Sequence, residues 1–275
     1  MENKLLKVLH AYHPNENAEF EKVDILVYRD SLILTGYDKM GEPMSSFVHY
    51  QFHDLNIPGV YSTQIQLALD QIPKAYRTAV IKNVFHCEST FVLVPQAELK
   101  GIDSFAAYRA SYSEPVEKLL NDDLETINSR EFYNYPFRVY NDLYFTFENA
   151  QFFSYHRPAF EVLKRKSAGK DLVFVSIKTK YVDVIVFKDG ELVECNTFEL
   201  SDYKSYNDLI KKNLKSVDIE KDSEDIFITC IRKEEKDAIF EELRSDFPNF
   251  NQHAEEVFGF PITFWDIYGD LILCS

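Results

Sequence analysis

The sequence predicts a mixed α/β fold built from two copies of one unit, each of which opens with three antiparallel strands. Residues 172–200 form three short apolar runs separated by two tight turns. A similar set of three runs occupies residues 23–52. Short runs that are rich in β-branched and aromatic residues and bounded by turn residues are typical of strands. The two sets therefore predict two related sheets.

The later set has the clearest pattern. Its strands are expected at residues 173–177 and 182–187 and after Gly190, because Asp189-Gly190 is a strong hairpin signal and glycine accepts the positive φ of a tight turn. Residues 182–187 are apolar on both faces except at Asp183. This composition favours a central strand that is covered on both sides.

The two sets align when the first is moved forward by 149 positions, which places Lys39-Met40-Gly41-Glu42 on Lys188-Asp189-Gly190-Glu191. Each set precedes a helical pattern and then a strand, as a duplicated unit requires. The expected helices are 63–72, with a capping box at Thr63 to Gln66, and 205–214, and the expected strands are 79–86 and 226–231. Further expected elements are a strand at 91–94 that forms an extra hairpin with 79–86, helices at 105–112 and 233–244, and a strand at 139–147.

A chain of 275 residues is long enough for two domains. A helix beginning near Pro158 and closed by Gly169 joins the halves, since proline at the start and glycine after the end are the usual asymmetry. We predict one domain of residues 1–168, with the extra hairpin, and a second of residues 169–275. The basic run 164–166 is interpreted as a complement to the C-terminus of this helix.

Composition restricts the class of partner and the compartment. The formal charge of −15 disfavours nucleic acid, whose binding depends on clustered Lys and Arg. The start of the chain lacks the pattern of a signal peptide, and no apolar run approaches the ~20 residues that span a bilayer. The four cysteines form no C-x-x-C pair and are interpreted as reduced thiols. We expect a soluble cytoplasmic protein without a membrane or nucleic-acid partner.

Several segments together resemble a bacterial family of unknown function that has the actin-like ATPase fold, in which two ribonuclease-H-like domains are joined. The segments are residues 173–177, 188–192, 196–198, 203–214 and 91–95. The resemblance extends over about residues 20–250. It implies that each predicted triple of strands opens one ribonuclease-H-like domain.

The resemblance also implies where a nucleotide would bind. In ATP-using members the first hairpin of each half carries Asp-x-Gly, and glycine lets the backbone approach phosphate. The corresponding positions here include Arg29, Asp30 and Ser31 in the first half and Lys178, Thr179 and Lys180 in the second, and neither tip contains glycine. No Gly-Gly loop or P-loop occurs elsewhere.

These positions are therefore predicted to be degenerate phosphate loops, and we predict no cofactor and no catalytic residue. The prediction is a pseudo-ATPase that acts as a binding or scaffold module, with another protein or a second copy of the chain as its partner. The alternative is an active actin-like ATPase or a relative of the sugar kinases.

Other chemistries receive weaker support from the sequence. His49 and His53 lie four apart in an expected strand and Asp54 follows, but no third metal ligand is visible, so they are interpreted as edge histidines and no metal is predicted. His86 and Cys87 are adjacent in a strand and point to opposite faces. A two-metal nuclease would need several converging carboxylates, and only Asp24 and Asp183 are candidates.

Residues 132–155 are unusually aromatic. We interpret most of these rings as core packing, and the alternative is an exposed surface for a protein partner or for self-association.

Overall fold

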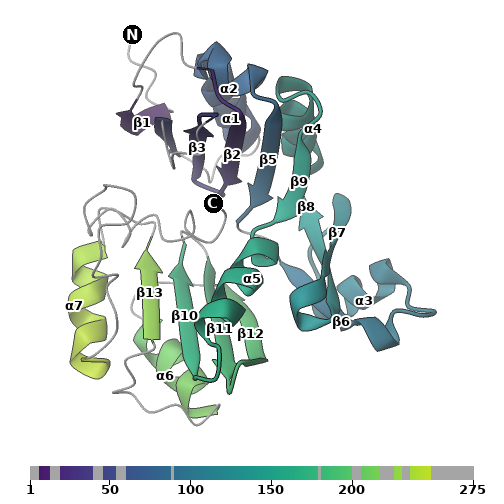
Figure 1. Cartoon of the computed structure of the whole chain (residues 1–275), viewed down its shortest axis with the longest axis vertical. Helices are drawn as coiled ribbons and strands as arrows, with labels where there is room; N and C mark the ends of the chain where they lie inside the picture. The colour runs from purple at the N-terminus through teal and green to yellow at the C-terminus, as the bar shows by residue number, and fades with distance from the viewer. Residues whose placement is uncertain are drawn as a thin grey trace. The chain divides into compact units, whose positions relative to one another are not determined.

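The computed structural model describes residues 6–12, 19–39, 46–53, 60–87, 90–178, 181–199, 206–216, 226–230 and 236–248. The chain forms two compact units, Met1–Arg157 and Pro158–Cys274 (Figure 1). Helix α5 (His156–Lys166) lies at the join, and the predicted boundary near residue 169 follows its C-terminal end. Gly169 has a φ of 72° just after this helix, as expected for a C-terminal cap.

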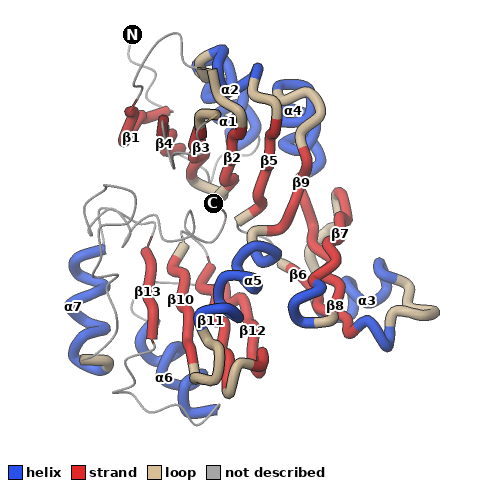
Figure 2. The backbone as a smooth tube through the Cα atoms, viewed as in Figure 1, coloured by secondary structure: helices blue, strands red, loops and turns tan. Residues whose placement is uncertain are grey.

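The first unit contains a six-stranded mixed sheet in the order β1-β4-β3-β2-β5-β9. The sheet begins as an antiparallel ribbon, and β5 and β9 then add parallel to β2 and to each other (Figure 2). Its strands are β1 (Leu6–Tyr12), β2 (Lys22–Val27), β3 (Ser31–Tyr37), β4 (Ser46–Phe52), β5 (Ile81–His86) and β9 (Gln151–Ser154). The helices of the crossovers are α1 (Val60–Gln71), α2 (Lys74–Thr78) and α4 (Phe137–Thr146).

A separate three-stranded antiparallel sheet is inserted between β5 and β9. It consists of β6 (Phe91–Pro95), β7 (Lys118–Leu124) and β8 (Ser129–Tyr135) in the order β6-β8-β7, with helix α3 (Ser104–Ser111). The predicted hairpin between 79–86 and 91–94 is wrong, because β5 pairs with β2 and β9 whereas β6 pairs with β8. Both segments are strands, as predicted, but they belong to different sheets, and closeness in the sequence does not show which strands pair.

The second unit has a four-stranded sheet in the order β12-β11-β10-β13. This order repeats β4-β3-β2-β5 of the first unit, with two antiparallel pairs followed by one parallel pair. Its elements are β10 (Leu172–Ile177), β11 (Tyr181–Lys188), β12 (Glu191–Glu199), α6 (Tyr206–Ser216), β13 (Ile226–Cys230) and α7 (Lys236–Asp246). The common strand order confirms the predicted duplication.

Strand register corrects the alignment of the first hairpins. Val27 pairs with Leu32 in the first unit, and Ile177 pairs with Val182 in the second, so the offset is 150 rather than 149. The tip beginning at Tyr28 therefore corresponds to the tip beginning at Lys178. In both tips the first backbone N–H donates to the carbonyl oxygen three residues later, at 2.9 Å.

The predicted strand at 139–147 is wrong, because this segment forms most of helix α4. Val139, Leu143 and Phe147 are buried and lie four residues apart, which is helical spacing. Pro136 is at the N-cap position of this helix. Proline is tolerated there because the first N–H groups of a helix have no hydrogen-bond partner within the helix. Helix α1 also begins earlier than predicted, at Val60, so the capping box at Thr63 lies inside it.

Candidate functional site

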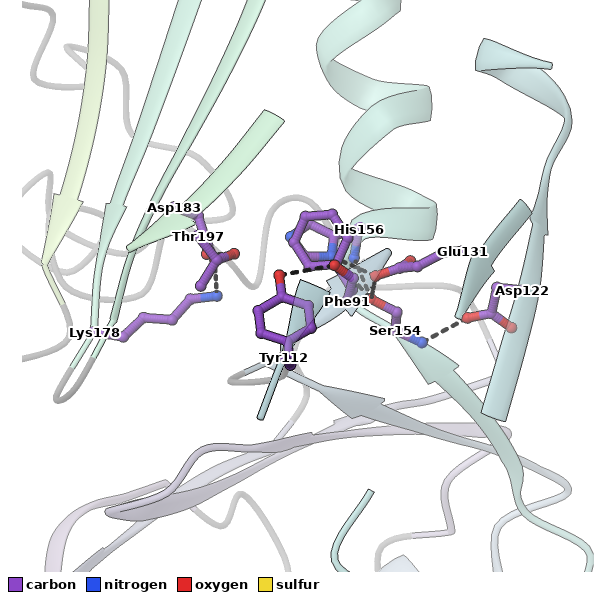
Figure 3. Close-up of polar contacts among 9 residues, drawn as sticks. All are labelled: Phe91, Tyr112, Asp122, Glu131, Ser154, His156, Lys178, Asp183 and Thr197. Carbon is purple, nitrogen blue, oxygen red and sulfur yellow. Dashed lines mark hydrogen bonds and ion pairs between the residues drawn. The ribbon is translucent and has the colours of Figure 1, made fainter. Parts of the chain in front are cut away.

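The first hairpin of the second unit points its lysine inward. The side chain of Lys178 is fully buried, and its ammonium group donates to Asp183 on β11 (Figure 3). Thr197 on β12 donates from Oγ1 to the other carboxylate oxygen of Asp183, at 2.5 Å. Thr179 and Lys180 lie outside the described residues. The predicted phosphate-loop position is thus occupied by an internal ion pair.

This ion pair determines what the hairpin can do chemically. Removal of one partner from a buried ion pair leaves an uncompensated charge and is strongly destabilising. The Asp183 carboxylate therefore needs the Lys178 ammonium as its partner. The arrangement is well suited to holding β10, β11 and β12 together.

The corresponding hairpin of the first unit is a closed turn. Ser31 donates from Oγ to Asp30 at 3.0 Å, and the backbone N–H of Phe52 donates to the Asp30 carbonyl oxygen at 2.7 Å. Tyr61 on α1 donates from its hydroxyl to the carbonyl oxygen of Tyr28 at 3.0 Å. Arg29 and Asp30 are half-buried and Ser31 is buried. Asp30 thus has the contacts of a turn-forming residue.

The two carboxylates considered for a nuclease lie in different units and have separate partners. Asp24 on β2 is buried, forms an ion pair with Lys22 at 2.8 Å and accepts from Asn83 at 3.0 Å. Burial raises the pKa of Asp24, and the Lys22 ammonium opposes this shift. Asp183 is the partner of Lys178. Each carboxylate has a structural role in its own sheet.

The histidines are more buried than predicted. His49 is buried because β1 pairs with the outer side of β4, so the interpretation as an edge histidine is wrong. The backbone of His53 is held by the buried side chain of Gln64, which accepts from its N–H at 2.7 Å and donates to its carbonyl oxygen. Asp54 lies outside the described residues. Among the described residues, no three His, Cys, Asp or Glu side chains are arranged to hold a metal.

The aromatic stretch 132–155 divides into core and surface. Most of its rings are buried or half-buried, as in the contact of Tyr140 with Phe152 at 4.5 Å between ring centroids. Three rings on α4 are exposed: Phe137, Tyr144 and Phe145, with 53%, 48% and 80% of their surface accessible. Tyr140 also stacks on Tyr144 with an interplanar angle of 14°. Tyr140 therefore connects the half-buried Phe152 with the exposed rings of α4.

A buried polar cluster in the first unit was not predicted from the sequence. Ser154 at the end of β9 lies between two acids of the three-stranded sheet (Figure 3). Its backbone N–H donates to Asp122 on β7 at 2.6 Å, and its hydroxyl donates to Glu131 on β8 at 2.9 Å. His156, the first residue of α5, contacts the same Glu131 oxygen through Nδ1 at 2.8 Å. All four residues are buried.

The fold identifies the class of protein. The structure is similar to a Bacteroides thetaiotaomicron protein with an actin-like ATPase fold and unknown function, with a TM-score of 0.70, 14% identity, and coverage of 92% of this chain and 96% of that chain. It is also similar to the PilM-PilN type IV pilus biogenesis complex, with a TM-score of 0.58, 11% identity, and coverage of 94% and 99%. The chain therefore has the actin-like ATPase fold.

The family follows from the sequence. Residues 12–250 match the model of the family described as "Protein of unknown function (DUF3822)", and the chain belongs to this family. No curated protein matches the sequence. In the part of the chain that the structure describes, no helix is long and apolar enough to cross a membrane.

Proposed function

We propose that this protein is a pseudo-ATPase: a binding or scaffold module on the actin-like fold that does not use nucleotide for catalysis. The observation that supports the proposal is the buried ion pair of Lys178 with Asp183, at the hairpin where ATP-using relatives carry a phosphate loop. The sequence of both hairpin tips adds support, because neither has the glycine that lets a backbone approach phosphate.

The partner in this proposal is a protein, either a different chain or a second copy. Exposed aromatic side chains are common anchors in protein interfaces, and Phe137, Tyr144 and Phe145 place three of them on one helix of the first unit. The PilM-PilN structure, which is similar in fold, is a complex of two proteins and supports a role of this kind. The charge of −15 favours partners other than nucleic acid.

A thermal-shift titration with Mg-ATP tests the proposal. A ligand present at a hundred times its dissociation constant stabilises the native state by about 2.7 kcal/mol. For a protein of this size that corresponds to a rise in Tm of roughly 5–10 °C. We expect a shift of less than about 1 °C at 10 mM Mg-ATP. Mg²⁺ alone and Mg-ADP are the controls, and an actin-like ATPase measured in parallel shows that the assay detects binding.

A clear rise in Tm with Mg-ATP would contradict the proposal, and phosphate release would then decide between the alternatives. Hydrolysis in the absence of sugar would indicate an active actin-like ATPase. Turnover that depends on an added sugar would indicate a relative of the sugar kinases.

A further inference from the structure

Two acids lie where the three-stranded sheet contacts the main sheet of the first unit. Asp122 and Glu131 are direct cross-strand partners in the β7–β8 ladder, so their side chains leave the same face of the sheet. Both are buried. Like charges directly opposite each other are destabilising even on exposed strands, and burial increases the cost.

Both acids are used in contacts with the main sheet. Asp122 accepts from the backbone N–H of Ser154, and Glu131 accepts from the hydroxyl of Ser154 and contacts His156. These contacts connect β7 and β8 to β9 and to the start of α5 (Figure 3). Parting of the two sheets would expose both carboxyl groups to water.

Asp122 and Glu131 each face an acidic group and a basic group. The groups that face Asp122 are Glu131, the Tyr133 hydroxyl and the more distant Arg157 guanidinium. The groups that face Glu131 are Asp122, Ser154 and His156, whose ring packs against Phe91 and Tyr155. The second carboxylate oxygen of Glu131, Oε2, has no hydrogen-bond partner among the described residues. Burial and the neighbouring Glu131 carboxyl therefore favour the protonated form of Asp122.

We propose that the attachment of the three-stranded sheet is proton-dependent: Asp122 holds a proton beside Glu131 while the sheets are joined and releases it when the sheets part. The proton comes from solvent on closing and returns to solvent on opening. Acid therefore strengthens the attachment, and a rise in pH from acidic to neutral weakens it.

The direction of the pKa shift agrees with this geometry. Burial, followed by the charge of Glu131, raises the pKa of Asp122 from 3.8 to about 6, although the hydrogen bond from Ser154 opposes the shift. A carboxyl group with a raised pKa in the joined state contributes stability below that pKa and loses it as the pH rises. Between pH 5 and pH 7 the opening equilibrium should increase about tenfold.

Hydrogen exchange followed by mass spectrometry measures this opening in the full chain. After correction for the intrinsic exchange rate, amides of β6, β7 and β8 should open about ten times more often at pH 7 than at pH 5. Asp122→Asn keeps an acceptor for the Ser154 N–H and removes the titrating group. It should reduce the dependence to less than about twofold.

Asp123→Asn is the matched control, because Asp123 is the next residue on β7 but is exposed and paired with Arg130 at 2.6 Å. This variant should keep the wild-type pH dependence. If Asp122→Asn does not fold, the carboxyl carbon resonance of Asp122 in the wild-type protein replaces it as the test, with an expected midpoint near pH 6. Opening that is independent of pH in the wild type, or an Asp122 carboxyl that is fully ionised at pH 5, would overturn the proposal.

Discussion

The buried charges of the second unit occupy positions that the first unit fills with uncharged side chains. By strand register Lys178 corresponds to Tyr28 and Asp183 corresponds to Ile33, and all four are buried. The same hairpin can thus be closed by an ion pair or by apolar packing. Since a buried ion pair is often no more stable than hydrophobic residues of similar volume, the charges are not required by the fold.

Substitutions at this pair should show strong coupling. Lys178→Ala leaves Asp183 buried without its cation and is expected to lower the free energy of unfolding by about 3–5 kcal/mol. The double variant Lys178→Met with Asp183→Leu should recover most of that loss, because no charge remains buried. Urea unfolding monitored by circular dichroism measures both effects.

The control for this series is Lys164→Ala, which removes an ion pair with the exposed Glu191 at 3.3 Å. Such surface pairs contribute less than about 1 kcal/mol. Equal losses for Lys164→Ala and Lys178→Ala would show that the buried pair has no special role.

At the scale of secondary-structure elements, the sequence predicts those features that depend on a few neighbouring residues, such as tight turns. The turn at Asp189-Gly190 was found because both residues adopt positive φ, 52° and 80°, which few residue types tolerate. The segment 139–147 was assigned wrongly because Val, Tyr and Phe favour strands, whereas its buried residues repeat every four positions. Tertiary packing decided the structure of this segment.

Gly190 offers a prediction for one turn. Its φ of 80° costs a residue with a Cβ atom about 1–2 kcal/mol, so Gly190→Ala should lower the free energy of unfolding by that amount. A steric clash is not the cause of this loss. An added Cβ atom would lie 3.5 Å from its nearest neighbours, in Gly169 and Ser167, which is an ordinary van der Waals distance. Gly190→Asn should cost less, since asparagine tolerates this conformation. Equal losses for both variants in urea unfolding would exclude backbone conformation as the cause.

At the scale of the whole molecule, the duplication was predictable and the inserted sheet was not. Four strands of each unit share one order, so they leave two similar patterns in the sequence that can be compared with each other. The three-stranded sheet occurs once, and β7 reads KLLNDDL, with too few apolar residues to indicate a strand. Asp122 and Glu131 are brought together by the register of that sheet. No sequence motif marks this register, so the buried cluster could not be predicted.

The net charge of the chain predicts how it behaves toward nucleic acid. At −15 the chain should repel nucleic acid, and the repulsion should increase as salt is lowered, because the Debye length grows from about 10 Å at 0.1 M to about 30 Å at 0.01 M. We therefore expect no change in the fluorescence anisotropy of a labelled oligonucleotide at either salt concentration, and no degradation with Mn²⁺. Binding that strengthens at low salt would reveal a local basic surface that the net charge conceals. Degradation that Asp24→Asn abolishes would instead give the buried Asp24 a catalytic role, which its contacts with Lys22 and Asn83 argue against.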